Sequence, residues 1–145
     1  MNATLEKAKA LLNKGDGATL AGSPTFALVN GGQIYVSEDK GIKPLMCLLS
    51  DNPALLNGAS VADKVTGRAS ALLLICGKVK ELYTELISES ACAVLDGRID
   101  YTYDKSVEKI ENCIMEQAVH GIDNPEQAYE ALQNKIKNIH KGVKA

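Results

Sequence analysis

The sequence predicts an α/β fold built on a mixed sheet of about four or five strands, with a hairpin near the N-terminus. Two observations lead to this prediction. Strand-like segments at residues 25–30 and 33–37 flank Asn30-Gly31-Gly32, where glycine supplies the positive φ of a tight turn. Residues 79–103 then show a strand, a short helix and another strand in succession. Such a unit normally forms a crossover between parallel strands.

Length and composition predict one globular domain over residues 1–145. The chain has 145 residues, of which 46% are hydrophobic and 23% are charged. These values are ordinary for a globular protein and differ from the composition of disordered chains. A chain of this size can bury a substantial core but is too short for two full domains.

The N-terminal third is expected to contain two helices and the hairpin. Apolar residues from Leu5 to Leu12 recur at helical spacing and stop before Gly15, which predicts a helix over residues 4–14. Pro44 suits the first turn of a second, short helix, which we expect to end at Asp51-Asn52-Pro53.

The middle of the chain is expected to hold a buried central helix. Ser60-Val61-Ala62-Asp63 has the S-x-x-D spacing that can cap a helix start, and apolar residues continue from Val65 to Gly77. Small or apolar residues on every face predict that this helix packs closely on the sheet.

The second half is expected to add a strand over residues 79–87, a helix from Ser88 to Leu95 and a strand from Ile99 to Tyr103. Helical stretches follow from Cys113 to His120 and after Asn124-Pro125. Because a crossover helix starts where its strand ends, we expect helix starts near Ala62 and Ser88 to open onto one cleft.

Three stretches resemble a small prokaryotic protein family of unknown function. They are Ala62-Asp63-Lys64-Val65-Thr66-Gly67-Arg68-Ala69, Ile87-Ser88-Glu89-Ser90-Ala91, and Cys113-Ile114-Met115-Glu116 followed by Asn124-Pro125-Glu126. The resemblance covers roughly residues 20–133 and implies a cytidine-deaminase-like fold, with three layers in the order α/β/α. The family usually has proline where this chain has Ile114, which puts in doubt any role that needs a rigid turn there.

The chain lacks the zinc motifs of that fold. Zinc deaminases carry H-x-E and P-C-x-x-C at two helix starts, and neither motif is present. The histidines are His120 and His140, both late in the chain, and Cys92 is the one thiol near an expected helix start. A catalytic zinc needs three protein ligands, so we predict no metal and no cofactor. The four cysteines are widely spaced and fit no disulfide framework, and we expect buried thiols.

The residues at the two expected helix starts define a candidate site for a small anionic or nucleotide-like ligand, because helix N-termini favour negative charge. The candidate catalytic residues are Asp63, Glu89 and Cys113, and the candidate ligand-binding residues are Lys64, Arg68, Ser88, Ser90 and Glu116. A plain structural interpretation stands beside each role: Asp63 and the serines can cap helices, the basic residues can pair with acids, and Cys113 can be half-buried beside a surface glutamate.

Three functions stay open at this point. The first is a metal-free enzyme that acts on a small anionic metabolite or nucleotide. The second is a non-catalytic regulatory module with a deaminase-like scaffold. The third is an assembly module that forms a homo-oligomer through the apolar central helix and the exposed faces of the last helix, with Ala128, Ala131, Leu132, Ile136 and Ile139 in the interface.

Charge distribution and the N-terminal segment narrow the expected partners. A net charge of -2 gives no basic field for duplex nucleic acid. The segment from Met1 to Lys14 is charged and helical, and no apolar run is long enough to cross a bilayer. We therefore expect a cytoplasmic protein with no membrane partner.

Overall fold

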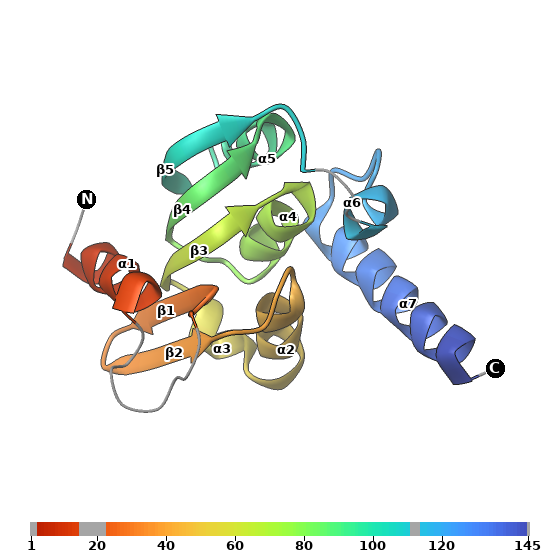
Figure 1. Ribbon diagram of the computed structural model, residues 1–145, viewed down its shortest axis with the longest axis horizontal. Coiled ribbons are helices and arrows are strands. Elements are labelled where there is room, and N and C mark those ends of the chain that lie inside the picture. The colour runs from red at the N-terminus through yellow and green to blue at the C-terminus, as the bar shows by residue number, and fades with distance from the viewer. Residues whose placement is uncertain (1–2, 15–22, 111–113, 145) are drawn as a thin grey trace.

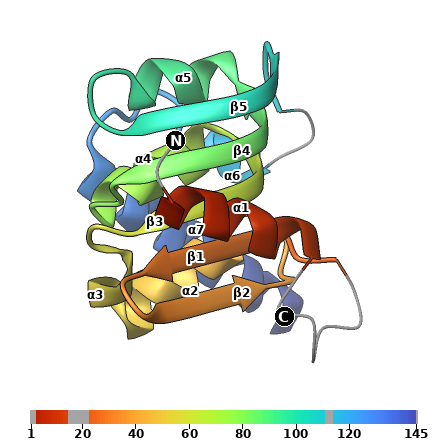
Figure 2. The ribbon, with the colours of Figure 1, turned by 90° about the vertical axis from the view of Figure 1, so that its left-hand side faces the viewer.

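A five-stranded mixed sheet forms the middle layer of the molecule, with helices on both of its faces (Figure 1, Figure 2). The structure is a computed structural model and describes residues 3–14, 23–110 and 114–144. The helices are α1 (Ala3–Lys14), α2 (Lys43–Asp51), α3 (Pro53–Leu56), α4 (Arg68–Cys76), α5 (Glu89–Leu95), α6 (Ile114–Ala118) and α7 (Pro125–Lys144). The strands are β1 (Phe26–Asn30), β2 (Gln33–Ser37), β3 (Ser60–Thr66), β4 (Glu81–Ser88) and β5 (Asp100–Val107).

The strands lie in the order β2-β1-β3-β4-β5. β1 is antiparallel to both of its neighbours, whereas β3, β4 and β5 run parallel. The expected hairpin is confirmed: Asn30 pairs with Gln33, and Gly31 between them has a φ of +60°. The expected parallel crossover from β4 through α5 to β5 is confirmed as well. These results confirm the predicted three-layer α/β/α fold.

The sheet buries side chains on both faces because successive residues of a strand point to opposite sides. Phe26, Leu28, Val61 and Leu82 pack in the larger core cluster, which also contains most of α4. Ala27, Val29, Ala62 and Tyr83 pack under the apolar stripe of α1, which consists of Leu5, Ala8 and Leu12. Figure 2 shows α1 alone on its face of the sheet, with α4, α5 and α7 behind the strands.

The prediction of a helix starting near Ala62 is wrong. Residues 60–66 form the central strand β3, and the buried helix begins only at Arg68, after Gly67. Val61 and Ala62 point to opposite faces and are both completely buried, so the strand shows no alternation of apolar and polar residues. A central parallel strand buried on both sides therefore has the sequence pattern of a buried helix, and Ser60 to Asp63 is not a capping box.

Two smaller differences also emerge. The segment after Asn52, expected to end a helix, forms the separate short helix α3. β5 extends to Val107, four residues beyond its expected end at Tyr103. Cys47, Cys76 and Cys92 are free thiols and half-buried rather than fully buried, while Cys113 lies outside the described residues.

Docking of α1 is expected to contribute strongly to stability. Leu12 of α1 is fully buried against the sheet, whereas its neighbour Asn13 is exposed. Leu12→Ala should therefore lower the free energy of unfolding by about 2–5 kcal/mol, measured by urea denaturation. Asn13→Ala is the matched control and should change it by less than about 0.5 kcal/mol. Equal effects of the two substitutions would show that α1 is not packed as described.

Candidate functional site

The start of α4 is occupied by a carboxylate from the C-terminal part of the same chain. The backbone N–H of Ala69, in the first turn of α4, donates a hydrogen bond of 2.9 Å to Oε2 of Glu116 in α6. Free N–H groups and the helix dipole make such a position favourable for negative charge. The residue expected to bind a ligand thus occupies the anion position of α4 itself.

Gly67 makes this contact possible. A Cβ atom at Gly67 would lie 1.6 Å from Oε1 of Glu116, so any larger residue would displace the carboxylate. The φ of Gly67 is -97°, which other residues also adopt, so the requirement for glycine comes from the close approach and not from the backbone.

Burial and hydrogen bonding act in opposite directions on Glu116. Desolvation raises the pKa of this carboxyl, while the N–H groups of Ala69 and Arg68 and the nearby Arg68 guanidinium lower it. Desolvation is the larger effect, so the pKa of Glu116 is raised overall and these contacts offset only part of the cost of burying its charge.

Arg68 fastens the segment that links α6 to α7. Its Nη2 donates a hydrogen bond to the carbonyl oxygen of Ile122 and lies 2.6 Å from Oδ1 of Asp123. Arg68 is largely buried, with a side chain 18% exposed, whereas Asp123 is 89% exposed. Together with Glu116, Arg68 joins the C-terminal helices to the first turn of α4, and we call these two residues with Gly67 and Ala69 the α4 latch.

Asp63 is a buried carboxyl on β3. Its residue is 5% exposed. Desolvation raises the pKa of Asp63 to about 8, although the N–H groups of Lys64 and Val65 act to lower it. Asp63 is therefore mostly protonated at neutral pH and can donate a hydrogen bond as a neutral acid.

Two threonines lie close to this part of the sheet. Thr84 is the register partner of Asp63 on β4, and the Thr66 hydroxyl donates to Oγ1 of Thr84 over 3.0 Å. Both threonines are fully buried.

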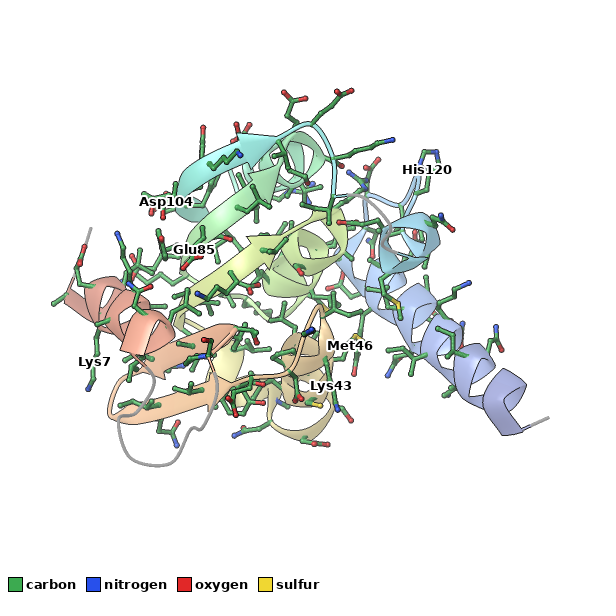
Figure 3. The ribbon with its side chains drawn as sticks, in the orientation of Figure 1. Lys7, Lys43, Met46, Glu85, Asp104 and His120 are labelled. Carbon is green, nitrogen blue, oxygen red and sulfur yellow. The ribbon has the colours of Figure 1, made fainter. Side chains whose placement is uncertain are left out.

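Lys64 points away from Asp63. Adjacent residues of a strand face opposite sides, and Lys64 pairs with Glu85 of β4 at 3.3 Å. Figure 3 shows Glu85 and Asp104 on the side of the sheet that carries α1. The structure therefore separates Lys64 from the other candidate residues.

The start of α5 is capped by its own serine. Ser88 is buried, and its Oγ accepts a hydrogen bond of 3.1 Å from the N–H of Ala91. Glu89 is exposed and Ser90 is half-buried. Because Thr66 and Ile87 are register partners on parallel strands, α4 and α5 begin side by side at one edge of the sheet.

The structure thus brings Arg68 and Glu116 together, places Ser88, Glu89 and Ser90 at the next helix start, and leaves Cys113 outside the described residues. The sequence reasoning missed Gly67, Asp123, Thr66 and Thr84. Gly67 and Thr66 fall within the recognised stretch around Arg68, but nothing in their spacing indicated that Gly67 would meet Glu116, about 50 positions later, or that Thr66 would meet Thr84.

Two searches over the described residues gave negative results. No group of three or more His, Cys, Asp and Glu side chains that could hold a metal ion was found in residues 3–14, 23–110 and 114–144. Within the same part of the chain, no helix combines the length and the apolar character needed to span a bilayer.

These features define an α/β protein of the three-layer class whose C-terminal helices are fastened to the start of its central helix. The family model TM1506, described as a domain of unknown function (DUF1893), matches residues 9–136. The chain belongs to this family. It is similar to the crystal structure of a DUF1893 family protein (TM1506) from Thermotoga maritima, with 24% identity, a TM-score of 0.78, and coverage of 93% of this chain and 91% of that one. No curated protein matches the chain.

The contact between Gly67 and Glu116 predicts a coupled pair of substitutions. Gly67→Ala and Glu116→Ala should each lower the free energy of unfolding by about 1–3 kcal/mol, because each removes the hydrogen bond between Glu116 and Ala69. The double variant should cost about as much as one single variant, measured by urea denaturation. Additive costs would contradict the contact.

The raised pKa of Asp63 predicts a pH dependence of stability. Above the unfolded pKa of 3.8, the unfolded chain loses a proton that the folded chain keeps up to about pH 8. The contribution of Asp63 to the free energy of unfolding therefore decreases as the pH rises from about 4 to about 8, and is lowest above that range.

Asp63→Asn isolates this contribution. The stability of the variant relative to the unchanged protein should rise with pH over that window, measured by urea denaturation at several pH values. If the two proteins show the same pH slope, Asp63 is ionised in the folded state.

Proposed function

We propose that this protein is a non-catalytic binding module whose ligand does not bind at the starts of α4 and α5, and in which a deaminase-like scaffold holds the C-terminal helices in place. The observation that carries the proposal is the Glu116 carboxylate on the N–H of Ala69. The position at which a ligand anion would bind α4 is filled by the chain's own side chain. The five-stranded mixed sheet with an N-terminal hairpin supports the deaminase-like assignment that the resemblance implies.

The internal partners of the other candidate residues support the same interpretation. Arg68 is paired with Asp123, Lys64 with Glu85, and Ser88 caps α5. Groups already engaged in the folded chain must lose these contacts before they can bind a ligand, which lowers the net affinity. A structural role explains all three contacts without a ligand.

The second candidate is a zinc-independent enzyme or ligand site at the starts of α4 and α5, and Asp63 is the observation that favours it. A buried carboxyl with a pKa of about 8 is typical of catalytic acids. In this candidate Asp63, Glu89 and Cys113 are catalytic, and Lys64, Arg68, Ser88, Ser90 and Glu116 bind a small anionic or nucleotide-like molecule in a cytoplasmic protein.

A thermal-shift screen separates the two candidates. The probes are inorganic phosphate, UMP and ribose 5-phosphate, each tested on the unchanged protein and on Glu116→Gln. The binding-module proposal predicts no rise in the melting temperature with these three probes, because Glu116 already occupies the start of α4 where their phosphate groups would bind. A ligand present at 100 times its Kd would add about 2.7 kcal/mol of stability, which is readily measured.

If a probe raises the melting temperature of the unchanged protein, and Arg68→Ala or Ser90→Ala abolishes that rise, the second candidate is favoured and the first is overturned. The control is Lys105→Ala, an exposed residue of β5, which should leave any such stabilisation intact. Turnover lost in Asp63→Ala or Glu89→Ala would likewise establish an enzyme.

A further inference from the structure

The apolar stripe of α7 continues past the part of the helix that the body of the protein covers. Ala128 and Leu132 are completely buried, whereas Ile136, four residues on, is half-buried and Ile139 is 37% exposed. Figure 1 shows the C-terminal half of α7 extending beyond the other elements. Helices of this kind gain most of their stability from packing of the apolar face, and Ile136 and Ile139 are covered less completely than Ala128 and Leu132.

The uncovered stripe forms one wall of a groove of about 670 Å³, and α2 forms the opposite wall. Its apolar lining comes from three segments. Ile42 lies just before α2 and Met46 within it, Met115 belongs to α6, and Ile136 and Ile139 belong to α7. Figure 3 shows Met46 on the side of α2 that faces α7. A predominantly apolar cavity of this size is typical of small-molecule sites, and methionine side chains adapt to irregular apolar ligands.

The polar residues of the groove give it a positive rim. Lys40, Lys43 and Lys137 line it together with one acid, Asp51. Lys43 also lies 3.7 Å from Asp39, but both side chains are well exposed, at 66% and 47%, so this pair is weak and Lys43 is free to bind another anion. The groove therefore combines an apolar floor with a site for one negative group.

We propose that the groove between α2 and α7 binds a small anionic amphiphile, a free molecule with an apolar body and one carboxylate or phosphate group. The inference deepens the proposed function by naming the class of ligand, and it rests on the protein being a binding module. The apolar body lies on Met46, Met115 and Ile136, and the anionic group lies among the lysines. Attraction to the basic rim selects against neutral and cationic amphiphiles of the same length.

A second copy of the chain is the competing occupant, and charge argues against it. A two-fold related α7 in the groove would bring a second Lys137 toward the three lysines already on the rim. Like charges held together at an interface oppose association. Small amphiphiles carry no such penalty.

The test is isothermal titration of the full chain with dodecanoate below its critical micelle concentration. Dodecyltrimethylammonium is the cationic counterpart of equal chain length. The proposal predicts saturable binding of dodecanoate at one site per chain and no saturable binding of the cationic probe. Dodecyl phosphate should bind like dodecanoate.

Variants locate the site. The double variant Lys43→Glu/Lys137→Glu should weaken dodecanoate binding by about tenfold or more, because it removes charge-assisted contacts. Met46→Ala should also weaken dodecanoate binding, because it removes apolar contact area from the groove without changing the charge. The matched control is Lys7→Glu/Lys105→Glu, two exposed residues away from the groove, which should bind like the unchanged protein. Circular dichroism of each variant checks that it is folded.

Several results would overturn the proposal. Absence of saturable dodecanoate binding, equal binding of the cationic probe, or binding that the groove variants leave unchanged would each do so. Sedimentation that shows a dimer lost in Ile139→Glu would identify a second copy as the occupant. Binding to phosphatidylglycerol vesicles without binding of monomeric dodecanoate would identify a membrane surface instead.

Failure of this proposal is distinguishable from failure of the proposed function. Stabilisation by phosphate or UMP that depends on Arg68 or Ser90 would contradict the proposed function, whereas dodecanoate binding that the groove variants weaken would still support the amphiphile site. If dodecanoate does not bind and the thermal-shift screen is also negative, only the proposal of an amphiphile ligand is contradicted, and the proposed function stands.

Discussion

The arrangement of this protein depends on one carboxylate at one helix start. Glu116 accepts a hydrogen bond from Ala69 in the first turn of α4, and Gly67 leaves the space in which the carboxylate lies. α4 is the buried helix that packs on the sheet, so whatever is fastened to its first turn is fastened to the core. Arg68 adds a second connection through Ile122 and Asp123. These contacts, together with the burial of Val119, Ala128 and Leu132 in the core, position α6 and α7 and hence the groove that they form with α2.

The latch also explains why the recognised stretches need not mark a reaction. The sequence around Gly67-Arg68-Ala69 and the sequence around Glu116 lie about 50 residues apart in the chain, yet they meet in the structure. The first stretch provides the free N–H groups of the helix start and the space beside Gly67, and the second provides the Glu116 carboxylate that fills this space. Asp63 is different, because burial raises its pKa to about 8 and no charged side chain among the described residues stabilises its ionised form. It is the residue of the candidate site for which a structural role is least obvious.

Local features of the sequence predicted much of the fold. The glycines at Asn30-Gly31-Gly32 identified the hairpin, and Ser88 identified the start of α5, because turn and cap chemistry act over a few residues. β3 was misread as helix because Val61 and Ala62 are buried on opposite faces of the central strand, which removes the alternation that identifies a strand. The latch could not be predicted from spacing, since it depends on the tertiary approach of α6 to α4. Lys64 lies on the opposite side of the sheet from Asp63, because one position along a strand moves a side chain to the other face.

The central claim is that Glu116 fastens the C-terminal helices to α4, and amide hydrogen exchange tests it most directly. Exchange measured on the unchanged protein and on Glu116→Ala compares the Ala69 amide, the α7 amides from Gln133 to Ile139, and the β3 and β4 amides. The account predicts faster exchange at Ala69 and along this part of α7 in the variant, with the strand amides changed much less. Unchanged protection of α7 in Glu116→Ala would contradict the account, because it would mean that α7 is held in place without the carboxylate.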